Sequence, residues 1–475
     1  MKRKRKIRKI PFFTLLILLL IVFLVIPFTL LKLTEDGEYY IENLKTSEVQ
    51  ASYKHYFFAN LKMDTLKSKY TCIKNESGKI LRLKSGIVNL KTKDITENTA
   101  YTTDNKETGY VNGNYGADAQ YIQTSSDGKK VCFKISGVKA WTDIDNVELY
   151  PYSDSYTLST YYIYNGSLIH TLSTDITQGI VNSIAIGPAP KFLKENTIYY
   201  SYDGHYFYTS FKNLVNDKKV NNTPYYNYYQ YVPHRTLSNL GNIAYDAFLE
   251  RYGIDSVANE YPCQDHESAL YDQADNFLSI QNEYTINASM MYALALNESG
   301  LGQSQFAIEY HNVFGHAALD ANPDNANQYK SLKQCIKQHA YNFLQQGYLD
   351  PKDSRYHGSW FGDKASGINV NYASDPYWGE KAASFYYRLD INGIDRKENK
   401  IKVIQLSQDV NIYAKNKKTV LYTFKKGSIV SISILKEQNG WYEIASEAPI
   451  RNNKINTHIK YKNGVGYINK SDFEK

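Results

Sequence analysis

The sequence predicts a multidomain α+β protein with a β-rich N-terminal half, a mainly helical region and a small β-rich module at the C-terminus. Three observations support this prediction. The chain has 475 residues, more than a single hydrophobic core usually serves. The period at which apolar residues recur changes from two residues to nearly four at about residue 239. Alternation returns after a charged run at residues 395–400.

The first 32 residues have the pattern of a membrane anchor. Seven Lys and Arg residues among the first nine precede an uncharged, almost wholly apolar run, Pro11–Leu31. About 20 such residues span a bilayer as a helix. A cleaved signal peptide shares the basic start, but its apolar core has only about 7–15 residues and ends in small residues. We therefore predict a cytoplasmic basic tail at 1–10 and a transmembrane signal anchor at 11–32, with the remainder of the chain outside the cell.

The net charge of +7 comes from this tail. Of the 55 basic side chains, 48 remain without these seven, against 48 acidic ones. A formally neutral remainder gives no support to nucleic-acid binding, which depends on neutralising phosphates. The cysteines stand far apart, so disulfides Cys72–Cys132 and Cys263–Cys335 or four free thiols are both compatible with an external location.

Residues 45–238 are predicted to be β-structure. Val131–Ile135 and Tyr161–Tyr164 are short, β-branched or aromatic segments between Asn-Gly and Asp-Gly turns. The clearest predicted hairpin joins Tyr199–Tyr202 to His205–Tyr208 through Asp203-Gly204, because Asp-Gly can adopt the positive φ angles of a type I′ turn. We divide this region into a β-rich module at 45–152 and a β-rich segment at 153–238.

Helical periodicity covers residues 239–392, most clearly in Ile286–Glu298 and Ser331–Leu344. The last predicted helix is Pro376–Leu389, with Asp375 as its N-cap and Pro376 at its first position. The run Asp395–Lys400 has too little apolar surface to pack and predicts a linker. Alternating strands after it predict a β-rich module at 402–475, namely Val410–Tyr413, Ile429–Ile432 and Trp441–Ile444.

The sharpest chemical signal is the end of the 286–298 segment, where Asn297-Glu298-Ser299-Gly300-Leu301-Gly302 follows an apolar helix. Glycosidic cleavage needs a carboxyl group that stays protonated near neutral pH. Burial at the C-terminus of a helix raises a carboxyl pKa in this direction. The glycines would let a sugar chain approach the backbone. For this motif alone, a helix C-cap with an incidental glutamate is the alternative.

Two further motifs follow in order, His311-Asn312-Val313-Phe314-Gly315 and Asn371-Tyr372-Ala373-Ser374-Asp375-Pro376-Tyr377-Trp378-Gly379-Glu380. Together with the Glu298 motif they resemble the family 73 glycoside hydrolases over about residues 260–390. The resemblance implies a lysozyme-like, mainly α catalytic domain at 239–392. It also implies hydrolysis of the β-1,4 bond after N-acetylglucosamine in peptidoglycan.

The same resemblance implies roles for single residues. Glu298 would be the general acid, and Tyr372 would hold the sugar or the attacking water. Trp378 and Tyr377 are expected to be exposed in the cleft because they stand beside Tyr372 in the motif. The expected substrate-binding residues are Asn312, Phe314, Gly315, Tyr377 and Trp378.

A second catalytic carboxylate is expected roughly 5–5.5 Å from Glu298 in a retaining enzyme and 6.5–9.5 Å away in an inverting one. Asp320, on the loop after the His-Asn-Val-Phe-Gly motif, is the first candidate. Weaker candidates are Glu309, Asp324 and Asp375. The acetamido oxygen of the substrate is the alternative nucleophile, and it would make a second carboxylate unnecessary. His311 and His316 lack the spacing and glutamate of a zinc peptidase, so we expect neither a metal nor another cofactor.

Residues 402–475 resemble bacterial SH3-like domains through Asn411-Ile412-Tyr413, Lys426-Gly427-Ser428 and Asn439-Gly440-Trp441-Tyr442, and the 45–152 module is a weaker match. Such modules imply binding to the wall. The 153–238 segment is similar to one that precedes the catalytic domain in long bacterial autolysins, where it would pack on that domain. The sequence thus predicts a membrane-anchored glucosaminidase that remodels the wall, with peptidoglycan and the cell membrane as partners. The alternatives are a muramidase, a lytic transglycosylase or a non-catalytic peptidoglycan-binding scaffold.

Overall fold

The computed structural model describes residues 38–316, 327–461 and 464–475. The chain divides into two compact units. The first comprises Met1–Asn89, Tyr121–Phe133 and Trp141–Ser153, and the second comprises Leu90–Gln120, Lys134–Ala140 and Asp154–Lys475. Several β-sheets and a separate helical region confirm the multidomain α+β class. The predicted anchor at 11–32 lies outside the described residues, and none of the helices within them is long and apolar enough to cross a bilayer.

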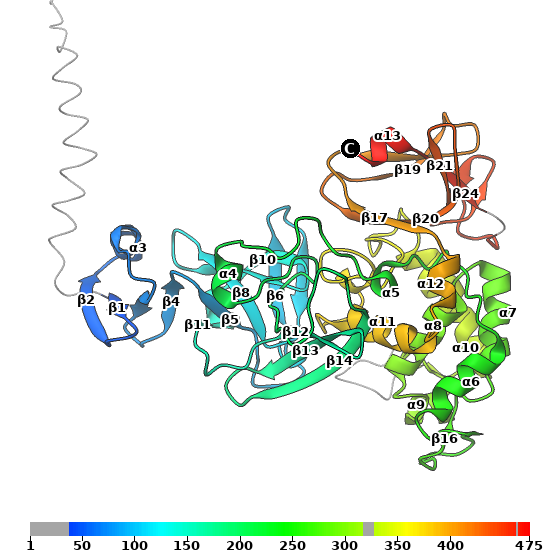
Figure 1. The fold of residues 1–475 in the computed structure, drawn as a ribbon, viewed down its shortest axis with the longest axis horizontal. Coiled ribbons are helices and arrows are strands. Elements are labelled where there is room, and N and C mark those ends of the chain that lie inside the picture. Colours follow the sequence, from blue (N-terminus) through cyan, green and yellow to red (C-terminus); the bar gives the residue numbers. More distant parts are fainter. Residues whose placement is uncertain (1–37, 317–326, 462–463) are drawn as a thin grey trace, which may run out of the picture. The chain divides into compact units, whose positions relative to one another are not determined.

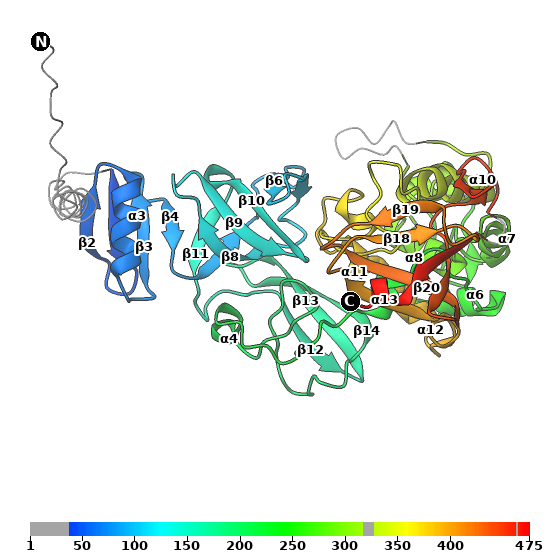
Figure 2. The same ribbon diagram turned by 90° about the horizontal axis from the view of Figure 1, so that it is seen from above.

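The first unit holds a four-stranded sheet in the order β2-β1-β3-β4. Helix α3 (Tyr56–Thr65) packs on this sheet (Figure 2) and contacts β1, β2 and β3. Its Ala59 and Met63 are buried because positions four apart share one helix face. Ile41 and Ile73, paired across β1 and β3, are buried beneath it. The strands are β1 (Tyr39–Asn43), β2 (Glu48–Tyr53), β3 (Thr71–Asn75) and β4 (Ile80–Leu83).

A seven-stranded sheet has the order β11-β5-β8-β9-β10-β6-β7. The predicted strand Val131–Ile135 is confirmed as part of β9. At one edge β6 and β7 form an antiparallel hairpin with Thr99 opposite Val111. The strands are β5 (Gly86–Asn89), β6 (Thr99–Thr103), β7 (Thr108–Val111), β8 (Asp118–Thr124), β9 (Lys130–Ile135), β10 (Val138–Asp143) and β11 (Glu148–Pro151), with a short helix η2 (Ile144–Asn146).

In the second unit, β12 (Thr160–Tyr164), β13 (Ser167–Asp175) and β14 (Ile180–Pro188) form an antiparallel sheet, which confirms the predicted strand Tyr161–Tyr164. The hairpin predicted through Asp203-Gly204 is wrong. Only an isolated bridge joins Tyr200 to Tyr208. The Asp203 carboxylate accepts hydrogen bonds from the backbone N–H groups of His205 and Tyr206. This local turn replaces the ladder that a type I′ turn would have allowed.

The helical region gathers around α8 (Ala288–Glu298), which confirms the helix predicted at 286–298 (Figure 1). The Asn287 side chain caps its start by accepting a hydrogen bond from the Met290 N–H. Every residue from Ala288 to Leu296 is buried, so α8 is the centre of the core and has no polar face. Its neighbours include α7 and α11. The other helices here are α4 (Phe211–Val215), α5 (Tyr228–Tyr231), α6 (Asn242–Glu250), α7 (Ala274–Tyr284), α9 (Gln305–Glu309), α10 (Leu332–Gln338), the π-helix η4 (His339–Tyr348), η5 (Ile368–Val370) and α11 (Trp378–Leu389), with a short parallel pair β15 (Ser256–Val257) and β16 (Glu267–Ser268).

Helix α11 begins later than predicted. Its first residue is Trp378, and Tyr377 rather than Asp375 occupies the N-cap position. The Asp375 carboxylate accepts a hydrogen bond from the Tyr377 N–H and so closes a turn before the helix. Gly379, in the first helical turn, lies against the backbone of Gly362. A Cβ atom at Gly379 would come within 1.9 Å of the Gly362 carbonyl oxygen, so only glycine allows this approach.

The linker predicted from the charged run is also wrong. Residues Ile394–Glu398 form helix α12, and Asp395 is fully buried. Its carboxylate accepts hydrogen bonds from the Asn239 N–H (2.6 Å) and the Tyr386 hydroxyl (2.9 Å). The buried Asp395 carboxylate therefore links the start of the helical region to α11. The charge of the run does not indicate that one of its residues is buried.

After α12 a six-stranded sheet has the order β17-β20-β21-β24-β18-β19. All three predicted strands are confirmed as parts of β18, β20 and β21. Tyr231 and Trp360 share a buried cluster with apolar residues of this sheet. The predicted SH3-like identity stays a prediction. The strands are β17 (Ile401–Gln405), β18 (Val410–Tyr413), β19 (Val420–Phe424), β20 (Ile429–Gln438), β21 (Trp441–Ala445) and β24 (Val465–Asn469), with a separate pair β22 (Ile450–Arg451) and β23 (Lys454–Ile455) and a final helix α13 (Lys470–Phe473).

None of the four cysteines forms a disulfide. Cys72, Cys132 and Cys335 are buried, and Cys263 is half-buried. Neither of the two disulfides considered from the sequence is formed in this structure.

Replacing Asp395 by Ala should destabilise the protein. The substitution leaves the Asn239 N–H and the Tyr386 hydroxyl without their acceptor, at a cost of about 2–4 kcal/mol in the free energy of unfolding. Glu398→Ala, on the exposed face of the same helix, should change it by less than about 0.5 kcal/mol. Urea unfolding followed by tryptophan fluorescence measures both. Equal midpoints for the two variants would contradict the structural role of Asp395.

Candidate active site

The candidate site starts from Glu298, the last residue of α8. The residue remains partly exposed although the helix before it is buried. Burial of the carboxyl group raises the pKa of Glu298 to about 7. Hydrogen bonds from Trp378 and Asn297 oppose this shift, and the negative charge of Asp375 adds to it. Glu298 is therefore protonated in a large fraction of molecules at neutral pH, and it can deliver that proton to a bound group.

Two aromatic rings lie beside this carboxyl group. The indole Nε1–H of Trp378 donates a hydrogen bond to Glu298 Oε1 at 2.5 Å. The Tyr372 ring stacks on the Trp378 ring, with 4.5 Å between centroids and 29° between planes. Burial and the nearby charge of Glu298 raise the pKa of Tyr372, so its hydroxyl keeps its proton and can act as a donor. The structure thus brings together three of the residues that the sequence motifs singled out.

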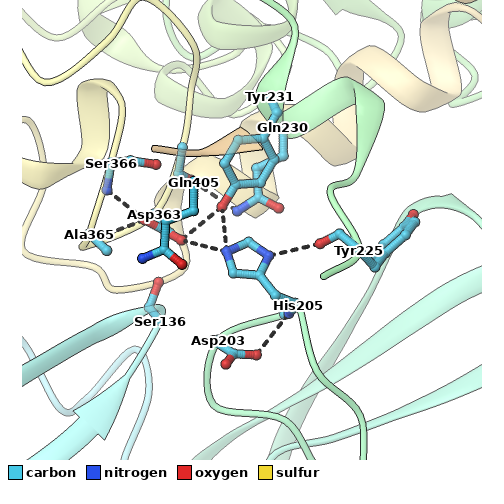
Figure 3. Close-up of polar contacts among 12 residues, drawn as sticks. Ser136, Asp203, His205, Tyr225, Gln230, Tyr231, Asp363, Ala365, Ser366 and Gln405 are labelled. Carbon is cyan, nitrogen blue, oxygen red and sulfur yellow. Dashed lines mark hydrogen bonds and ion pairs between the residues drawn. The ribbon is translucent and has the colours of Figure 1, made fainter. Parts of the chain in front are cut away.

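The loop that carries Tyr372 depends on Asp363 (Figure 3). One oxygen of Asp363 accepts hydrogen bonds from the backbone N–H groups of Ala365 and Ser366, both at 2.7 Å. The other accepts one from the Tyr231 hydroxyl at 2.8 Å and lies 3.5 Å from His205 Nε2. The other nitrogen of His205 contacts the Tyr225 carbonyl. Segments before the catalytic region therefore determine the shape of this loop.

Lys364 continues the same support. Its ammonium group donates to the carbonyls of Asn369 (2.9 Å), Val370 (3.2 Å) and Ala373 (3.0 Å), which flank Tyr372. Its backbone N–H donates to the Ser136 carbonyl. Burial lowers the pKa of Lys364 to about 8. The sequence motifs indicate neither Asp363 nor Lys364. A charged pair between tryptophan and glycine residues in Gly358–Gly367 was the only signal for them.

The His-Asn-Val-Phe-Gly motif forms a closed loop. The Asn312 amide donates to the His316 carbonyl and accepts from the His316 N–H, both at 3.0 Å. Phe314 stacks on His339 with 3.8 Å between centroids, and Gly315 supplies a positive φ of 61°. Asn312 and Phe314 are buried, so their side chains hold the loop together from inside. Their predicted contact with substrate, and that of Gly315, stays a prediction.

The histidines beside this loop form a neutral stack. His316 Nε2 lies 3.1 Å from His339 Nδ1, and burial lowers the pKa of His316 to about 3. The described residues contain no group of three or more His, Cys, Asp or Glu side chains with the geometry of a metal site.

Tyr377 and Trp378 are not exposed in a cleft, contrary to the expectation from their place in the motif. Their exposed fractions are 3% and 4%. Tyr377 packs edge-on against His170, with 4.9 Å between ring centroids. Trp378 is a hydrogen-bond donor to Glu298 and a platform for Tyr372. Tyr377 and Trp378 are buried by residues distant in the chain, such as His170 and Glu298, which a local motif does not reveal.

The candidates for a second carboxylate differ in where they lie and in what engages them. Asp320 and Asp324 lie outside the described residues. Glu309 ends α9 and accepts a hydrogen bond from Gln305. Asp375 is the carboxylate whose charge acts on Glu298, but its oxygens are engaged by Lys381 and the Tyr377 N–H. Asp375 therefore tunes the acid and is poorly placed to act as a free base.

Comparison with known proteins places this geometry in a class. Residues 274–391 match the Glucosaminidase family, described as mannosyl-glycoprotein endo-beta-N-acetylglucosaminidase. This span includes Glu298, the 311–315 loop, Tyr372 and Trp378. The chain thus contains a glycoside hydrolase domain. More particularly, the match is to proteins of the endo-β-N-acetylglucosaminidase type, which confirms the resemblance to family 73 found in the sequence.

Two curated relatives are 34% identical over 126 residues. Both carry the name "Putative endo-beta-N-acetylglucosaminidase", one from Streptococcus pneumoniae serotype 4 and one from strain R6. The match covers 26% of this chain but only 18% and 17% of the relatives. Among solved structures, a catalytic mutant of S. aureus autolysin E in complex with the disaccharide NAG-NAM is 18% identical. It covers 39% of this chain and 81% of its own, with a TM-score of 0.27, too low to establish a shared fold.

The pKa of Glu298 can be measured directly by ¹³C NMR of glutamate-labelled protein. We expect a value of about 7. Trp378→Phe removes a hydrogen bond that stabilises the carboxylate, so the pKa should rise further. Asp375→Asn removes a negative charge that favours the protonated form, so the pKa should fall. Shifts of the same sign in both variants, or a parent value near the ordinary glutamate pKa of about 4.3, would contradict this description.

Proposed function

We propose that the protein is an endo-β-N-acetylglucosaminidase that hydrolyses the β-1,4 bond after N-acetylglucosamine in peptidoglycan glycan strands. The observation that carries the proposal is the Glu298 carboxyl group, with a pKa of about 7, in hydrogen-bond contact with Trp378. A group with this pKa can protonate the leaving oxygen at neutral pH. The names of the two pneumococcal relatives agree with this activity.

In this mechanism Glu298 is the general acid, and Tyr372 is a neutral hydroxyl donor beside it. The stacking of Tyr372 on Trp378 and the three carbonyl contacts of Lys364 limit how far the Tyr372 hydroxyl can move. Tyr372 would hold the sugar or the attacking water in the cleft. The loop that contains Asn312, Phe314 and Gly315 would shape the neighbouring side of the substrate-binding cleft.

The proposed second carboxylate is Asp320. Asp375 is engaged by Lys381 and by its own turn, which disfavours it as the base. The alternative is assistance by the substrate acetamido group, which needs no second carboxylate.

Mass spectrometry of borohydride-reduced products from purified peptidoglycan tests the activity. We expect reduced N-acetylglucosamine ends from the parent protein and a rate at least about 100-fold lower for Glu298→Gln. Reduced muramic ends would identify a muramidase, anhydromuramic ends a transglycosylase, and binding without products a scaffold. In the same assay, Asp320→Asn should lower the rate by a similar factor. A loss below about threefold would favour the acetamido route.

We further propose that residues 11–32 anchor the protein in the cell membrane as a single span, with the bulk of the chain facing the wall. Anchoring would keep the enzyme near newly made strands and suit it to remodelling. The modules at 45–152 and 402–475 would be SH3-like domains that bind the cell wall. On cell fractionation, the full chain should sediment with membranes at high salt, and a version lacking residues 1–33 should not. Recovery of the full chain in the soluble fraction would contradict the anchor.

A further inference from the structure

A cavity of about 800 Å³ lies beside the candidate site, within the second unit. One wall is the turn between β6 and β7 with residues Gly137–Lys139, and the other is formed by residues of the segment 354–371. Val370 and Asn371, the two residues before Tyr372, line it. One lining residue, Asn371, is therefore adjacent in the chain to Tyr372, a predicted catalytic residue.

The ionisable side chains around this cavity carry a positive excess. Lysines and an arginine outnumber carboxylates among its lining residues. Asp104 is paired with Lys139 at 3.2 Å, and Arg355 is paired with Asp353, which is not among the lining residues. Lys364 is fully buried and donates to carbonyls rather than to a carboxylate, so its charge is not neutralised by direct contact. A cation in such a low-dielectric wall attracts anions more strongly than one in water. The charged lining residues are Lys106, Lys139, Arg355 and Lys364, with Asp104 and Glu107.

Arg355 is held in a fixed position at this wall. Its Nε and Nη2 groups bind the two oxygens of Asp353 at 2.8 and 2.9 Å. Its guanidinium lies over the Tyr348 ring, 5.3 Å from the centroid. It also lies over Gly347, where a Cβ atom would come within 2.4 Å of Nη2. The bidentate pair leaves the Nη1 amino group for another acceptor, and orientation beforehand lowers the entropic cost of binding one.

A chain of ring contacts joins Arg355 to the acid. The Tyr348 ring lies 5.4 Å from the Tyr372 ring, which stacks on Trp378, the donor to Glu298. Arg355 and Glu298 thus lie at the two ends of one series of contacting side chains, and a single branched substrate would reach both. The residues that line the cavity do not include Glu298, Tyr372 or Trp378. An anion held by Arg355 would therefore be on a branch of the substrate, away from the bond that is cut.

The chemistry of the substrate identifies the anion. In peptidoglycan the sugars of the intact strand are uncharged at neutral pH, and the carboxylates are on the peptide stems. We propose that this cavity binds a carboxylate of a peptide stem on the strand being cut, with Arg355 as its anchor and Lys106 as a second contact. The protein would then prefer stem-bearing strands with free carboxylates over neutralised ones. This inference rests on the proposed function, because it assigns the stem to the same substrate.

Amidation of the stems tests the contact without changing the glycan. Carbodiimide coupling with methylamine converts free stem carboxylates of uncrosslinked strands to neutral amides. For the full-length parent we expect kcat/KM to fall about tenfold or more on amidated strands, the range of one charge-assisted hydrogen bond. Arg355→Gln should show that loss on native strands and little further loss on amidation, because the two changes remove the same contact.

Two controls guard against a general defect. Arg251→Gln removes an arginine of the same region that does not line the cavity, and it should retain the full amidation effect. Lys106→Gln, at an exposed turn, should reduce the amidation effect in part even if Arg355→Gln folds poorly. If amidation costs Arg355→Gln as much as the parent, or costs the parent nothing, the cavity does not read stem carboxylates.

Cosedimentation with the same strands separates this failure from that of the proposed activity. If neither strand yields reduced N-acetylglucosamine ends, the proposed function fails. In that case weaker binding on amidation, seen in the parent and lost in Arg355→Gln, would still support the carboxylate site. Binding that ignores both changes would overturn it.

Discussion

The hydrogen bond from the Trp378 indole to the Glu298 carboxyl joins the two parts of the candidate site. Glu298 ends a helix that is buried along nearly its whole length, and Trp378 begins another. Both residues are therefore attached to helices of the core, and the donor and the acceptor meet at 2.5 Å. The contact also acts against burial in determining the Glu298 pKa, which leaves the acid near neutrality rather than far above it.

The position of Trp378 depends in turn on the loop before it. Gly379 lets the first turn of α11 lie against Gly362, in the same loop as Asp363 and Lys364. Asp363 shapes this loop by accepting two backbone N–H groups, and Lys364 holds the carbonyls on both sides of Tyr372. These two side chains are charged and buried. Each is stabilised by several hydrogen bonds, as a buried charge must be.

Segments far from the catalytic motifs supply the other half of these contacts. Tyr231 and His205 reach Asp363, and Ser136 accepts the Lys364 N–H. His170 binds Glu380 of α11 at 2.5 Å and also packs on Tyr377. The residues around 134–140 and 161–231 are thus part of the support of the site. A glucosaminidase domain cut at residue 274 would lack them, although the family match begins there.

Sequence alone determined the elements whose signals are local. The burial of α8, the strands β9, β12, β18, β20 and β21, and the glutamate at the end of α8 follow from apolar spacing and turn residues, which act over a few positions. The three motifs likewise identified the family. Only the tertiary structure decided which of these side chains face water. It buried Trp378 and Tyr377, converted the charged run at 395–400 into a packed helix through Asp395, and replaced the Asp203 hairpin by a side-chain turn. It also revealed Asp363, Lys364 and Arg355. Their roles depend on partners that are distant in sequence or on loop conformations that apolar spacing does not encode, and burial is a property of the whole fold.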